Sequence, residues 1–425
     1  KIDFLKIRGS FGILGKDNVN AWLWTQLYTR NPDKGPIFGT NSSTNTSATI
    51  RMPKQGVNPD VHWDKTYKTN FGIDMAFLKN RMSANLDFYY DMGREMFASH
   101  QGTSYYPNTV GIQPAPENFG EVDTYGVELS LGWKDKIGKD MSYWVKLTTG
   151  YNDNKIRETG WKAAYDFDKL VRNERSDRGL WGYECIGMFR SNQEINEYFD
   201  KYSITKYLGN TKENVHPGML IYKDVRGQYD ESTGTFGPAD GIVDEQDYIK
   251  ISHRASNPYG GTLNFGFSYK DFSISAQFGA SWGAYSLVPT TMRKESYSEY
   301  SNVSAMWKDM FVYEDIYDAN NIVTVAQNRN AKYPNIRYSS VNGAPSTFWK
   351  VSAATVQLRN MTVAYALPKE WLKIIGISSC RFNLTCQNVF NFLNPYPEGA
   401  WASWAGSYGY YPNLRKFTLG VNVSF

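Results

Sequence analysis

The sequence predicts an all-β protein, an antiparallel transmembrane β-barrel with long loops, and three observations support this prediction. Aromatic residues make up 16% of the chain although its mean hydropathy is −0.52. Apolar and polar residues alternate along about ten segments of roughly 11 to 14 residues, whereas an average globular strand has about 5 or 6 and a membrane strand needs about 9 to 11. The connections alternate strictly between short turns and long loops, as in outer-membrane barrels.

Composition limits the class of protein without deciding it. The 425 residues could form two or three ordinary domains or one large barrel. A net charge of +4, with 21% charged residues, gives no case for a nucleic-acid partner. A polar average with many aromatic residues suits a membrane barrel, because only alternate strand residues meet lipid and aromatic girdles mark both interfaces. Carbohydrate-binding β-proteins share this bias, so composition leaves both classes open.

The chain contains neither a membrane-helix pattern nor a secretory leader. No apolar run approaches the roughly 20 residues that a membrane helix needs. The first residues, KIDFLKIRGSFGIL, already lie inside a strand-like pattern, which suggests the middle of a longer polypeptide. Of the three cysteines, Cys380 and Cys386 fall on one expected strand about 20 Å apart, too far to bridge. We therefore expect structural thiols.

The first five expected strands each place apolar residues at every second position, so that one face is apolar and the other polar. Only Leu78 to Asn80 separate the second strand from the third, which predicts a tight hairpin. The apolar residues, strand by strand, are Leu5, Ile7, Phe11 and Ile13; Tyr67, Phe71, Ile73, Met75 and Phe77; Met82, Ala84, Leu86, Phe88 and Tyr90; Tyr125, Val127, Leu129, Leu131 and Trp133; and Tyr143, Val145, Leu147 and Tyr151.

The last five expected strands show the same alternation with one interruption. Between Leu358 and Met361 the apolar residues change parity, which predicts a bulge near Arg359 and Asn360, because one extra residue reverses the register. The apolar residues are Leu263, Phe265, Phe267 and Tyr269; Phe272, Ile274, Ala276 and Phe278; Val356, Leu358, Met361, Val363 and Tyr365; Phe382, Leu384 and Cys386; and Phe417, Leu419, Val421, Val423 and Phe425.

The connections divide into two kinds. Short turns are expected near residues 79, 137, 270 and 370, and long loops at about 15–62, 94–118, 156–256, 285–350 and 391–412. In the largest loop, Ser191 and Glu194 form a capping-box pattern that predicts a short helix. Apolar spacing over 300–310 predicts another helix in the next loop. Loops with helices of their own are expected to fold as structure.

Eight stretches then resemble a known family. The chain is similar, over nearly its whole length, to the carboxyl-terminal portion of SusC/RagA-type TonB-linked outer-membrane proteins, the nutrient importers of Bacteroides-like bacteria. The matching stretches, in the same order, are FLKIRGSFGILG at 4–15, NRMSANLDFYYDMGREMF at 80–97, ENFGEVDTYGVELSLGW at 117–133, ADGIVDEQDYIKI and NPYGG at 239–261, AKYP at 331–334, STFWKVSAATVQLRNMTVAYALPKEWL at 346–372, CQNVFNF at 386–392 and YPNLRKFTLGVNVSF at 411–425.

The resemblance implies a barrel of about 22 strands with an internal plug, a TonB box ahead of the plug and a SusD-like surface lipoprotein over the mouth. About ten strands are expected here, and the plug, the TonB box and the first barrel strands lie outside residues 1–425. We therefore interpret the chain as the carboxyl-terminal part of an outer-membrane barrel that another segment or chain completes. A small closed ten-strand barrel is the alternative, but loops of more than half the chain fit it poorly.

Two sets of residues are candidates for binding. Loop aromatics present flat apolar faces with a polar edge, which suit sugar rings or peptide side chains, although packing or an interface girdle explains most such residues. Asp240, Asp244 and Asp247 resemble part of a calcium loop, but Phe236 and Pro238 replace the upstream oxygen ligands, so a solvated turn is the simpler interpretation. The candidate aromatics are Trp22, Trp24, Tyr105, Tyr106, Trp181, Trp349, Trp401, Trp404 and Tyr408.

Catalysis is not expected, and no cofactor is implied. His62, His100, His216 and His253 all fall in expected loops, and the sequence lacks HExxH, phosphate-loop and paired-cysteine metal motifs. The charged residues of the expected strands are expected to line a wet lumen, where polar side chains are the default. These residues are Arg8, Asp74, Asp87, Glu128 and Lys146.

The resemblance implies import of an oligosaccharide or oligopeptide across the outer membrane, driven by TonB and assisted by a SusD-like lipoprotein. A ligand too large for open porins requires a wide lumen, and a wide lumen requires a plug. Two alternatives stay open. One is an adhesin or structural surface barrel that displays its loops and transports nothing. The other is a soluble glycan-binding β-protein, which the strand lengths and the loop asymmetry disfavour.

Overall fold

In the computed structural model, ten long strands form one antiparallel sheet, as the alternation predicts. The sheet order follows the chain order, so each strand lies beside its predecessor and its successor. The strands are β1 (Ile2–Lys16), β4 (Asp64–Phe77), β5 (Met82–Ala98), β6 (Glu117–Ile137), β7 (Met141–Glu158), β16 (Tyr259–Tyr269), β17 (Phe272–Trp282), β22 (Thr355–Ala366), β23 (Ser379–Leu393) and β24 (Lys416–Ser424).

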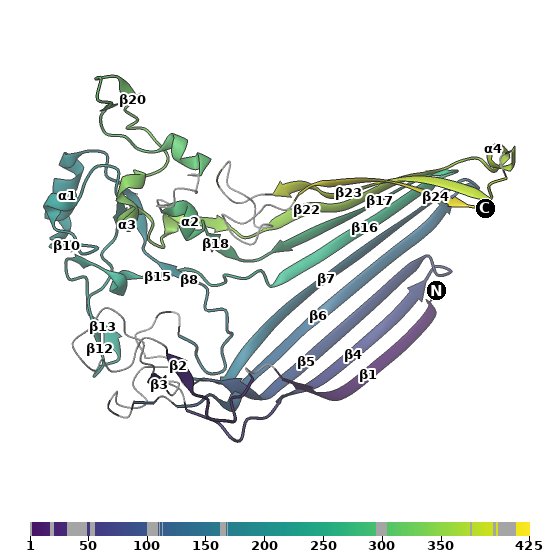
Figure 1. Cartoon of the computed structure of the whole chain (residues 1–425), viewed down its shortest axis with the longest axis horizontal. Helices are drawn as coiled ribbons and strands as arrows, with labels where there is room; N and C mark the ends of the chain where they lie inside the picture. Colours follow the sequence, from purple (N-terminus) through teal and green to yellow (C-terminus); the bar gives the residue numbers. More distant parts are fainter. Residues whose placement is uncertain are drawn as a thin grey trace.

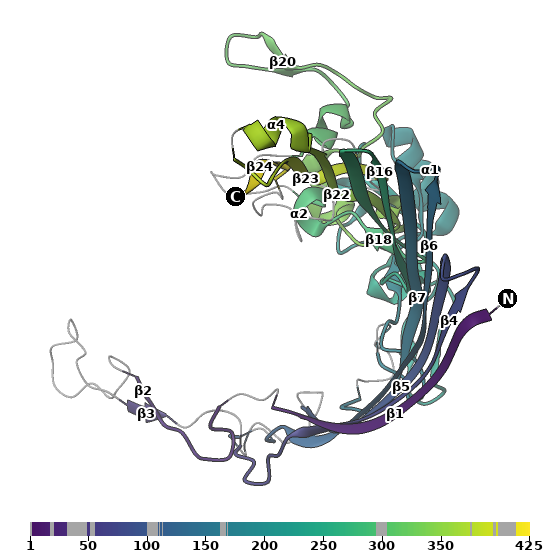
Figure 2. The same cartoon turned by 90° about the vertical axis from the view of Figure 1, so that its right-hand side faces the viewer.

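The structure describes residues 2–17, 21–31, 49–51, 56–99, 109, 111–112, 114–161, 167, 169–294, 304–374, 376–393, 397 and 414–425. Within these residues the sheet curves like an open trough, with β1 at one edge and β24 at the other (Figure 2). Both edge strands are paired on one side only, so the described residues do not close into a small barrel.

The short turns and the long loops lie at opposite ends of the strands (Figure 1). Ile2 pairs with Phe77, and Ser379 pairs with Ser424, so both ends of the chain lie at the short-turn end. Three connections there are tight turns, and the fourth contains the helix α4 (Lys369–Ile374). This separation of short turns from long loops is the asymmetry that the sequence predicts.

The convex face of the sheet is apolar. Phe71, Phe88 and Leu419 are among the alternate apolar side chains that remain exposed on it, at 45%, 46% and 73%. Aromatic residues border this apolar band at both ends. On β16, Tyr259 and Tyr269 lie at opposite ends of the strand, about 34 Å apart at strand rise and roughly 26 Å in height at a tilt of about 40°. An apolar band of about 25 Å between aromatic girdles is the outer surface of an outer-membrane barrel.

Two belts of aromatic side chains follow the borders of this band across neighbouring strands. At the long-loop end, Tyr90 stacks on Tyr125, and Tyr151, Tyr259 and Trp282 form a second contiguous group. At the short-turn end, the belt runs across neighbouring strands and consists of Trp133, Tyr143, Tyr269, Phe272, Tyr365 and Phe382. We call the belt at the long-loop end, formed by Tyr90, Tyr125, Tyr151, Tyr259 and Trp282, the upper aromatic belt.

The expected bulge is confirmed, but three strands are longer than predicted. The β17–β22 register shifts between Gln277 and Phe278, where Arg359 is the additional residue on β22. β5, β6 and β7 have 17, 21 and 18 residues, because their ladders continue beyond the upper aromatic belt. Charged pairs stabilise this extension: Asp123, which is 1% exposed, accepts hydrogen bonds from Arg94 at 2.8 Å and Arg157 at 2.6 Å.

The two largest loops fold together into one compact body, which we call the loop unit and define as the described residues of 159–258 and 283–354. Tyr207, Tyr222 and Phe311 are 0% exposed in its larger core, and Val288, Met292 and Trp307 lie in a smaller one. The helix α1 (Asn192–Tyr202) begins at the predicted cap, where Ser191 Oγ accepts the Glu194 N–H. The chain thus builds its largest apolar cores outside the sheet.

The remaining elements are short, and most lie in the loop unit. The helix expected over 300–310 is instead the 3₁₀ helix η4 (Ala305–Asp309), within the described part of that range. The short strands are β2 (Thr29–Asn31), β3 (Thr49–Arg51), β8 (Leu180–Gly182), β9 (Cys185–Met188), β10 (Lys206–Tyr207), β11 (Leu220–Tyr222), β12 (Tyr229–Asp230), β13 (Thr235–Phe236), β14 (Ile242–Val243), β15 (Ile249–Ser252), β18 (Tyr285–Leu287), β19 (Ile316–Tyr317), β20 (Val323–Val325) and β21 (Lys350–Ser352). The short helices are η2 (Lys212–Asn214), η3 (Glu245–Asp247), α2 (Thr290–Arg293), η5 (Ile336–Tyr338), α3 (Ser339–Asn342) and η6 (Thr347–Trp349).

The helices of the described residues are all short. Not one of them combines the length and the apolar character that crossing a bilayer as a helix requires.

Candidate functional site

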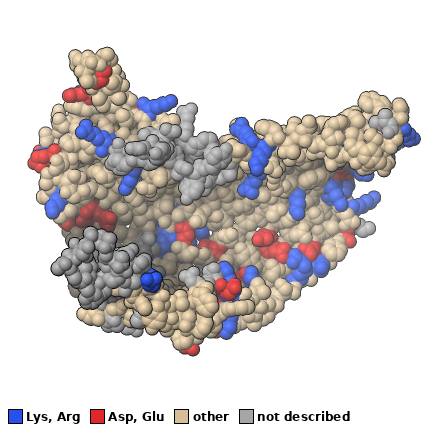
Figure 3. All heavy atoms as spheres, in the orientation of Figure 1, with Lys and Arg blue, Asp and Glu red and all other residues tan. Residues whose placement is uncertain are grey.

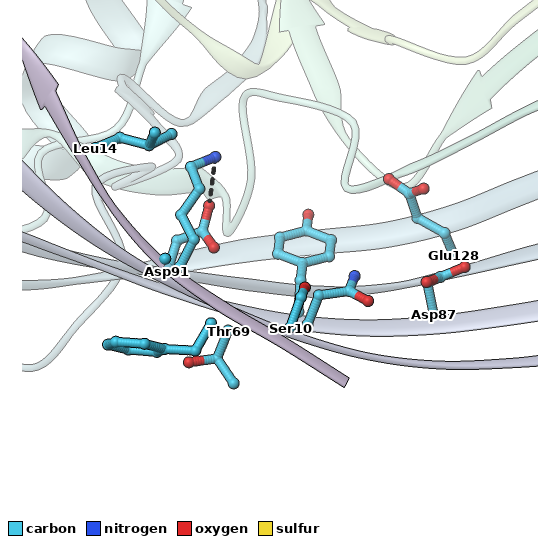
Figure 4. Close-up of a pocket in the computed structure, with 11 residues that line it drawn as sticks. Ser10, Leu14, Thr69, Asp87, Asp91 and Glu128 are labelled. Carbon is cyan, nitrogen blue, oxygen red and sulfur yellow. Dashed lines mark ion pairs between the residues drawn. The ribbon is translucent and has the colours of Figure 1, made fainter. Parts of the chain in front are cut away.

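The concave face of the sheet carries the polar side chains that alternate with the apolar ones, and it is hollowed over β1, β4, β5 and β6. The hollow has a volume of about 720 Å³. Asp87, Asp91 and Glu128 point into it in Figure 4, and Lys68 Nζ lies 3.1 Å from Asp91 Oδ2. Charged side chains therefore line this wall of the trough, as the sequence predicts for a lumen.

One arginine organises the charges beside this hollow. Arg8 donates to Asp74 at 2.8 Å and to Asp87 at 3.0 Å, and Asn85 donates to Asp74 at 2.8 Å. The guanidinium crosses Gly72, where an added Cβ would lie 2.6 Å from Arg8 Nη2. Glycine at this position therefore leaves room for the bridge between β1 and β5. The sequence predicts that these charged residues line a lumen, and the structure shows that Arg8 forms hydrogen bonds with both Asp74 and Asp87.

Glu128 is the exception on this wall. It lies directly opposite Asp87 in the β5–β6 register, and both side chains face the hollow. Two like charges in facing positions repel one another. Asp87 shares the Arg8 guanidinium with Asp74, whereas Glu128 is exposed and has no basic partner within the described residues. The wall thus presents Glu128 as a carboxylate without a basic partner.

The opposite wall is purely basic. The strands β16, β17, β22, β23 and β24 contain no Asp or Glu. Arg359 lies over Gly279, whose added Cβ would meet its Nε at 2.3 Å, and Arg381 donates to Ser273 Oγ at 2.8 Å. Lys416 adds a further basic residue on β24, opposite Gln387 in the β23–β24 register. Figure 3 views this face, with mixed charges over β1 and β4–β6 and basic side chains over β22–β24.

Sequence reasoning missed this second wall, although the sequence contains a signal for it. Arg359 falls in the bulge, so its face could not be assigned from alternation alone. The complete lack of acidic residues in five consecutive strands could have been noticed. The result is a trough with acidic and basic side chains on one wall and basic side chains alone on the other.

The predicted loop aromatics do not gather at one place. Trp22 and Trp24 are 61% and 57% exposed, and their ring centroids lie 6.2 Å apart. Trp181 is half-buried beneath the Lys250 ammonium group. Trp349 is only 1% exposed, and its Nε1–H donates to the Asn342 carbonyl, so this residue packs in the core. The other candidates, Tyr105, Tyr106, Trp401, Trp404 and Tyr408, lie outside the described residues.

The carboxylates of Asp240, Asp244 and Asp247 accept hydrogen bonds from nearby backbone N–H groups. Asp247 is 0% exposed and accepts three backbone N–H groups, from Val225, Arg226 and Asp244, at 2.7 to 3.0 Å. Asp244 Oδ1 accepts the N–H two residues later at 2.8 Å, and Asp240 Oδ1 does the same at 2.9 Å. The described residues contain no group of three or more His, Cys, Asp or Glu that could hold a metal ion.

Comparison with known proteins finds homologous receptors. No family model matches the chain. The TonB-dependent receptor SusC of Bacteroides thetaiotaomicron is 27% identical over 440 residues, which cover 99% of this chain and 37% of SusC. The TonB-dependent receptor P39 of Formosa agariphila is 23% identical over 459 residues, which cover 100% of this chain and 40% of P39. This chain is homologous to SusC/RagA-type TonB-dependent receptors.

The solved structures agree on the fold. The RagAB peptide transporter matches with a TM-score of 0.66 at 18% identity, over 100% of this chain and 41% of the matched chain. Its 'open-open' state gives a TM-score of 0.64 at 17% identity. The ten-stranded antiparallel sheet therefore has the fold of part of the RagA outer-membrane barrel. The chain spans about 40% of the length of the relatives that it matches.

The names of the matched proteins agree with the non-catalytic character expected from the sequence. The relatives are named as receptors and the solved structures as peptide transporters and importers. The soluble glycan-binding alternative is wrong, because the chain shares the outer-membrane barrel fold.

Cys185 provides a prediction about the loop unit. Its thiol lies in the pocket between β9 and the segment 347–348 and donates to the Gly187 carbonyl at 3.3 Å. Burial raises the pKa of this thiol to about 11. At pH 8, iodoacetamide is expected to label Cys185 on the order of a hundredfold more slowly than an ordinary thiol of pKa about 8.5, because the thiolate is the nucleophile.

The labelling rate is measured by mass spectrometry of the intact protein, and it is expected to rise as the pH approaches 11. The urea-unfolded protein is the control, since its Cys185 should regain the ordinary rate. Equal rates for the folded and unfolded protein at pH 8 would mean that Cys185 is not buried in solution. All three cysteines are free thiols in the structure, as the sequence predicts.

Proposed function

We propose that this chain forms part of the wall and the extracellular loop unit of a TonB-dependent importer for an oligomeric nutrient. The homologous receptors and the barrel fold support this proposal. The ten strands would be completed by further strands, and a plug and a TonB box would lie in the portion of the protein that the chain does not span. Residues 1–425 would then be the carboxyl-terminal part of the barrel.

The observation that carries the proposal furthest is the division of charge across the concave face. Glu128 stands uncompensated on one wall, and Arg359 and Arg381 stand on the other without a carboxylate on their strands. A passing ligand with both charges can contact both walls favourably, since opposite charges attract over several ångströms even when partly screened. An oligopeptide carries an ammonium and a carboxylate, so its charges fit this lumen better than those of a neutral oligosaccharide.

The loop unit supports a role in ligand capture. It is a folded body at the mouth of the barrel with its own apolar cores, and loops built in this way commonly carry binding surfaces. A SusD-like surface lipoprotein is the partner that we propose for it. In this arrangement the lipoprotein delivers the ligand to the loop unit, the plug moves when TonB acts on it, and the charged walls guide the ligand inward.

The composition of the native particle tests this proposal. The protein is extracted from the outer membrane in mild detergent, and its subunits are identified by intact-mass and peptide mass spectrometry. We predict that these 425 residues come with a plug-bearing segment, on the same polypeptide or another, and with a surface lipoprotein. Recovery without a plug would contradict import and would favour the alternative, a surface barrel that displays its loops as an adhesin or structural protein.

A further inference from the structure

A pocket rich in basic side chains lies just above the upper aromatic belt, where β7 meets the loop unit. Its volume is about 270 Å³, and we call it the rim pocket. Tyr125, Lys155, Arg175, Arg178 and Lys250 are among the residues that line it. Lys155 lies on the same face of β7 as Tyr151, which belongs to the upper aromatic belt, and its Nζ lies 6.0 Å from the centre of the Tyr125 ring.

The acidic residues of the rim pocket already have partners. Glu174 forms an ion pair with Arg178, and Asp153 accepts the Arg254 guanidinium at 2.6 Å. Asp177 accepts three backbone N–H groups, from Gly179, Ala255 and Ser256, at 2.9 to 3.0 Å. Glu174 and Asp153 therefore pair with arginines, and Asp177 binds backbone N–H groups of the loop. None of the three forms an ion pair with Lys155, Arg175 or Lys250.

Three cations of the rim pocket have no carboxylate partner within the described residues. Arg175 donates only to backbone carbonyls, at 3.1 and 2.7 Å. Lys155 and Lys250 contact only aromatic rings, at 6.0 and 5.1 Å from the ring centroids. Burial and the neighbouring Arg178 and Arg175 lower the pKa of Lys250, and the opposing attraction of Glu174 does not reverse this, so the positive charges repel one another here. An anion in the pocket would relieve this repulsion.

The height of the pocket identifies the anion. The upper aromatic belt marks the border of the apolar band, and Tyr125 of this belt lines the pocket. Lys155 follows Tyr151 by four positions, which is about 13 Å along the strand and roughly 10 Å in height at a tilt of about 40°. Charged headgroups of the outer leaflet begin at this level. Lys and Arg bind phosphate oxygens, and their aliphatic stems can lie along apolar surface. We propose that the rim pocket binds the phosphate group of an outer-leaflet lipid.

This lipid site is independent of import, because it rests on the outward face of the barrel and on the loop unit alone. A bound lipid headgroup would join the loop unit to β6 and β7 from outside. It would therefore fix the loop unit relative to the membrane surface. Free phosphate shares the same chemistry, so the test must separate the two sources.

The test uses the intact protein in mild detergent and native mass spectrometry during titration with phosphatidylglycerol, with phosphatidylcholine as the zwitterionic comparison. The triple variant Lys155→Gln, Arg175→Gln and Lys250→Gln is expected to bind phosphatidylglycerol at least tenfold more weakly, since each basic residue at an anionic membrane surface contributes several-fold in affinity. Lys155→Arg alone keeps the charge and is expected to leave binding unchanged.

The matched control removes three exposed lysines elsewhere in the loop unit, by Lys201→Gln, Lys206→Gln and Lys223→Gln. This control is expected to bind like the parent protein. Equal lipid binding by the parent and by both triple variants would overturn the proposal. Binding of inorganic phosphate that displaces phosphatidylglycerol completely, with no preference for the lipid, would also overturn it, because the site would then be one for free phosphate. Amide exchange of the loop unit verifies that each variant is folded.

Discussion

Replacing Asn342 by leucine is expected to unfold the loop unit and leave the barrel strands intact. Asn342 is 0% exposed and joins the two loops that make this body. Its Oδ1 accepts the Leu220 N–H at 2.8 Å, and its Nδ2 donates to the carbonyls of Gly218 and Asn335 at 3.0 and 2.8 Å. Leucine has a similar volume but satisfies none of these groups.

The expected cost is about 4 kcal/mol. The Leu220 N–H is left without its partner, which costs about 1 to 3 kcal/mol, and the Gly218 and Asn335 carbonyls, which still accept the N–H groups of Asn335 and Tyr338, each lose one hydrogen bond worth about 1 kcal/mol. Amide hydrogen exchange measured by mass spectrometry checks the result. Segments 218–222 and 335–349 are expected to lose at least a hundredfold of their protection, while β5 to β7 keep theirs. The tip of the β19–β20 hairpin offers a matched control: Asn320→Leu, at an exposed position, should leave exchange unchanged. Normal protection in Asn342→Leu would contradict this role for the side chain.

Reversing the basic wall is expected to reduce uptake of oligopeptides by about tenfold. The double variant Arg359→Glu and Arg381→Glu replaces two attractive charges by two repulsive ones for the carboxylate of a passing ligand. At separations of about 10 Å in a wet lumen, each reversal changes the interaction by roughly 1 kcal/mol, so two reversals correspond to a factor on the order of ten. The effect should shrink at higher ionic strength, because salt screens charges over about 8 Å at physiological concentration.

Uptake of a fluorescent or isotope-labelled oligopeptide by whole cells provides the measurement. The paired control, Lys369→Glu with Lys373→Glu, makes the same charge change at two exposed residues of α4, at the short-turn end and away from the concave face. Surface levels of both variants are verified by immunoblotting of the outer membrane. If the double variant transports oligopeptides as well as the control does, the basic wall plays no part in guiding the ligand.

The strands could be predicted from the sequence because their information is local. Alternation of apolar and polar residues determines each face, and the parity change at Arg359 and Asn360 is visible without any tertiary contact. The predicted ends of β5, β6 and β7 were wrong, because long-range pairs such as Arg94 and Arg157 with Asp123 extend those ladders. Such pairs join residues far apart in sequence, so periodicity alone cannot show them.

The loop unit could be predicted only in part. The cap at Ser191 locates α1, but the core beneath it depends on contacts between the two loops, for example the Tyr222 hydroxyl with the Val341 carbonyl. The position of Trp349 could not be predicted from the sequence for the same reason. Its residue type suits a ligand platform and a core equally well, and only the packing of the second loop buries it. The charge division of the concave face required the register of Arg359, which the bulge obscures.

Energy-dependent uptake is the measurement that tests import most directly. Cells that express the protein are given labelled oligopeptides, and accumulation is compared with that in cells lacking this protein and in cells lacking TonB. We predict that accumulation falls to the background of passive leakage in both deletion strains and returns when the gene is restored. Correct insertion of the barrel with no difference in accumulation of oligopeptides or oligosaccharides among the three strains would contradict import.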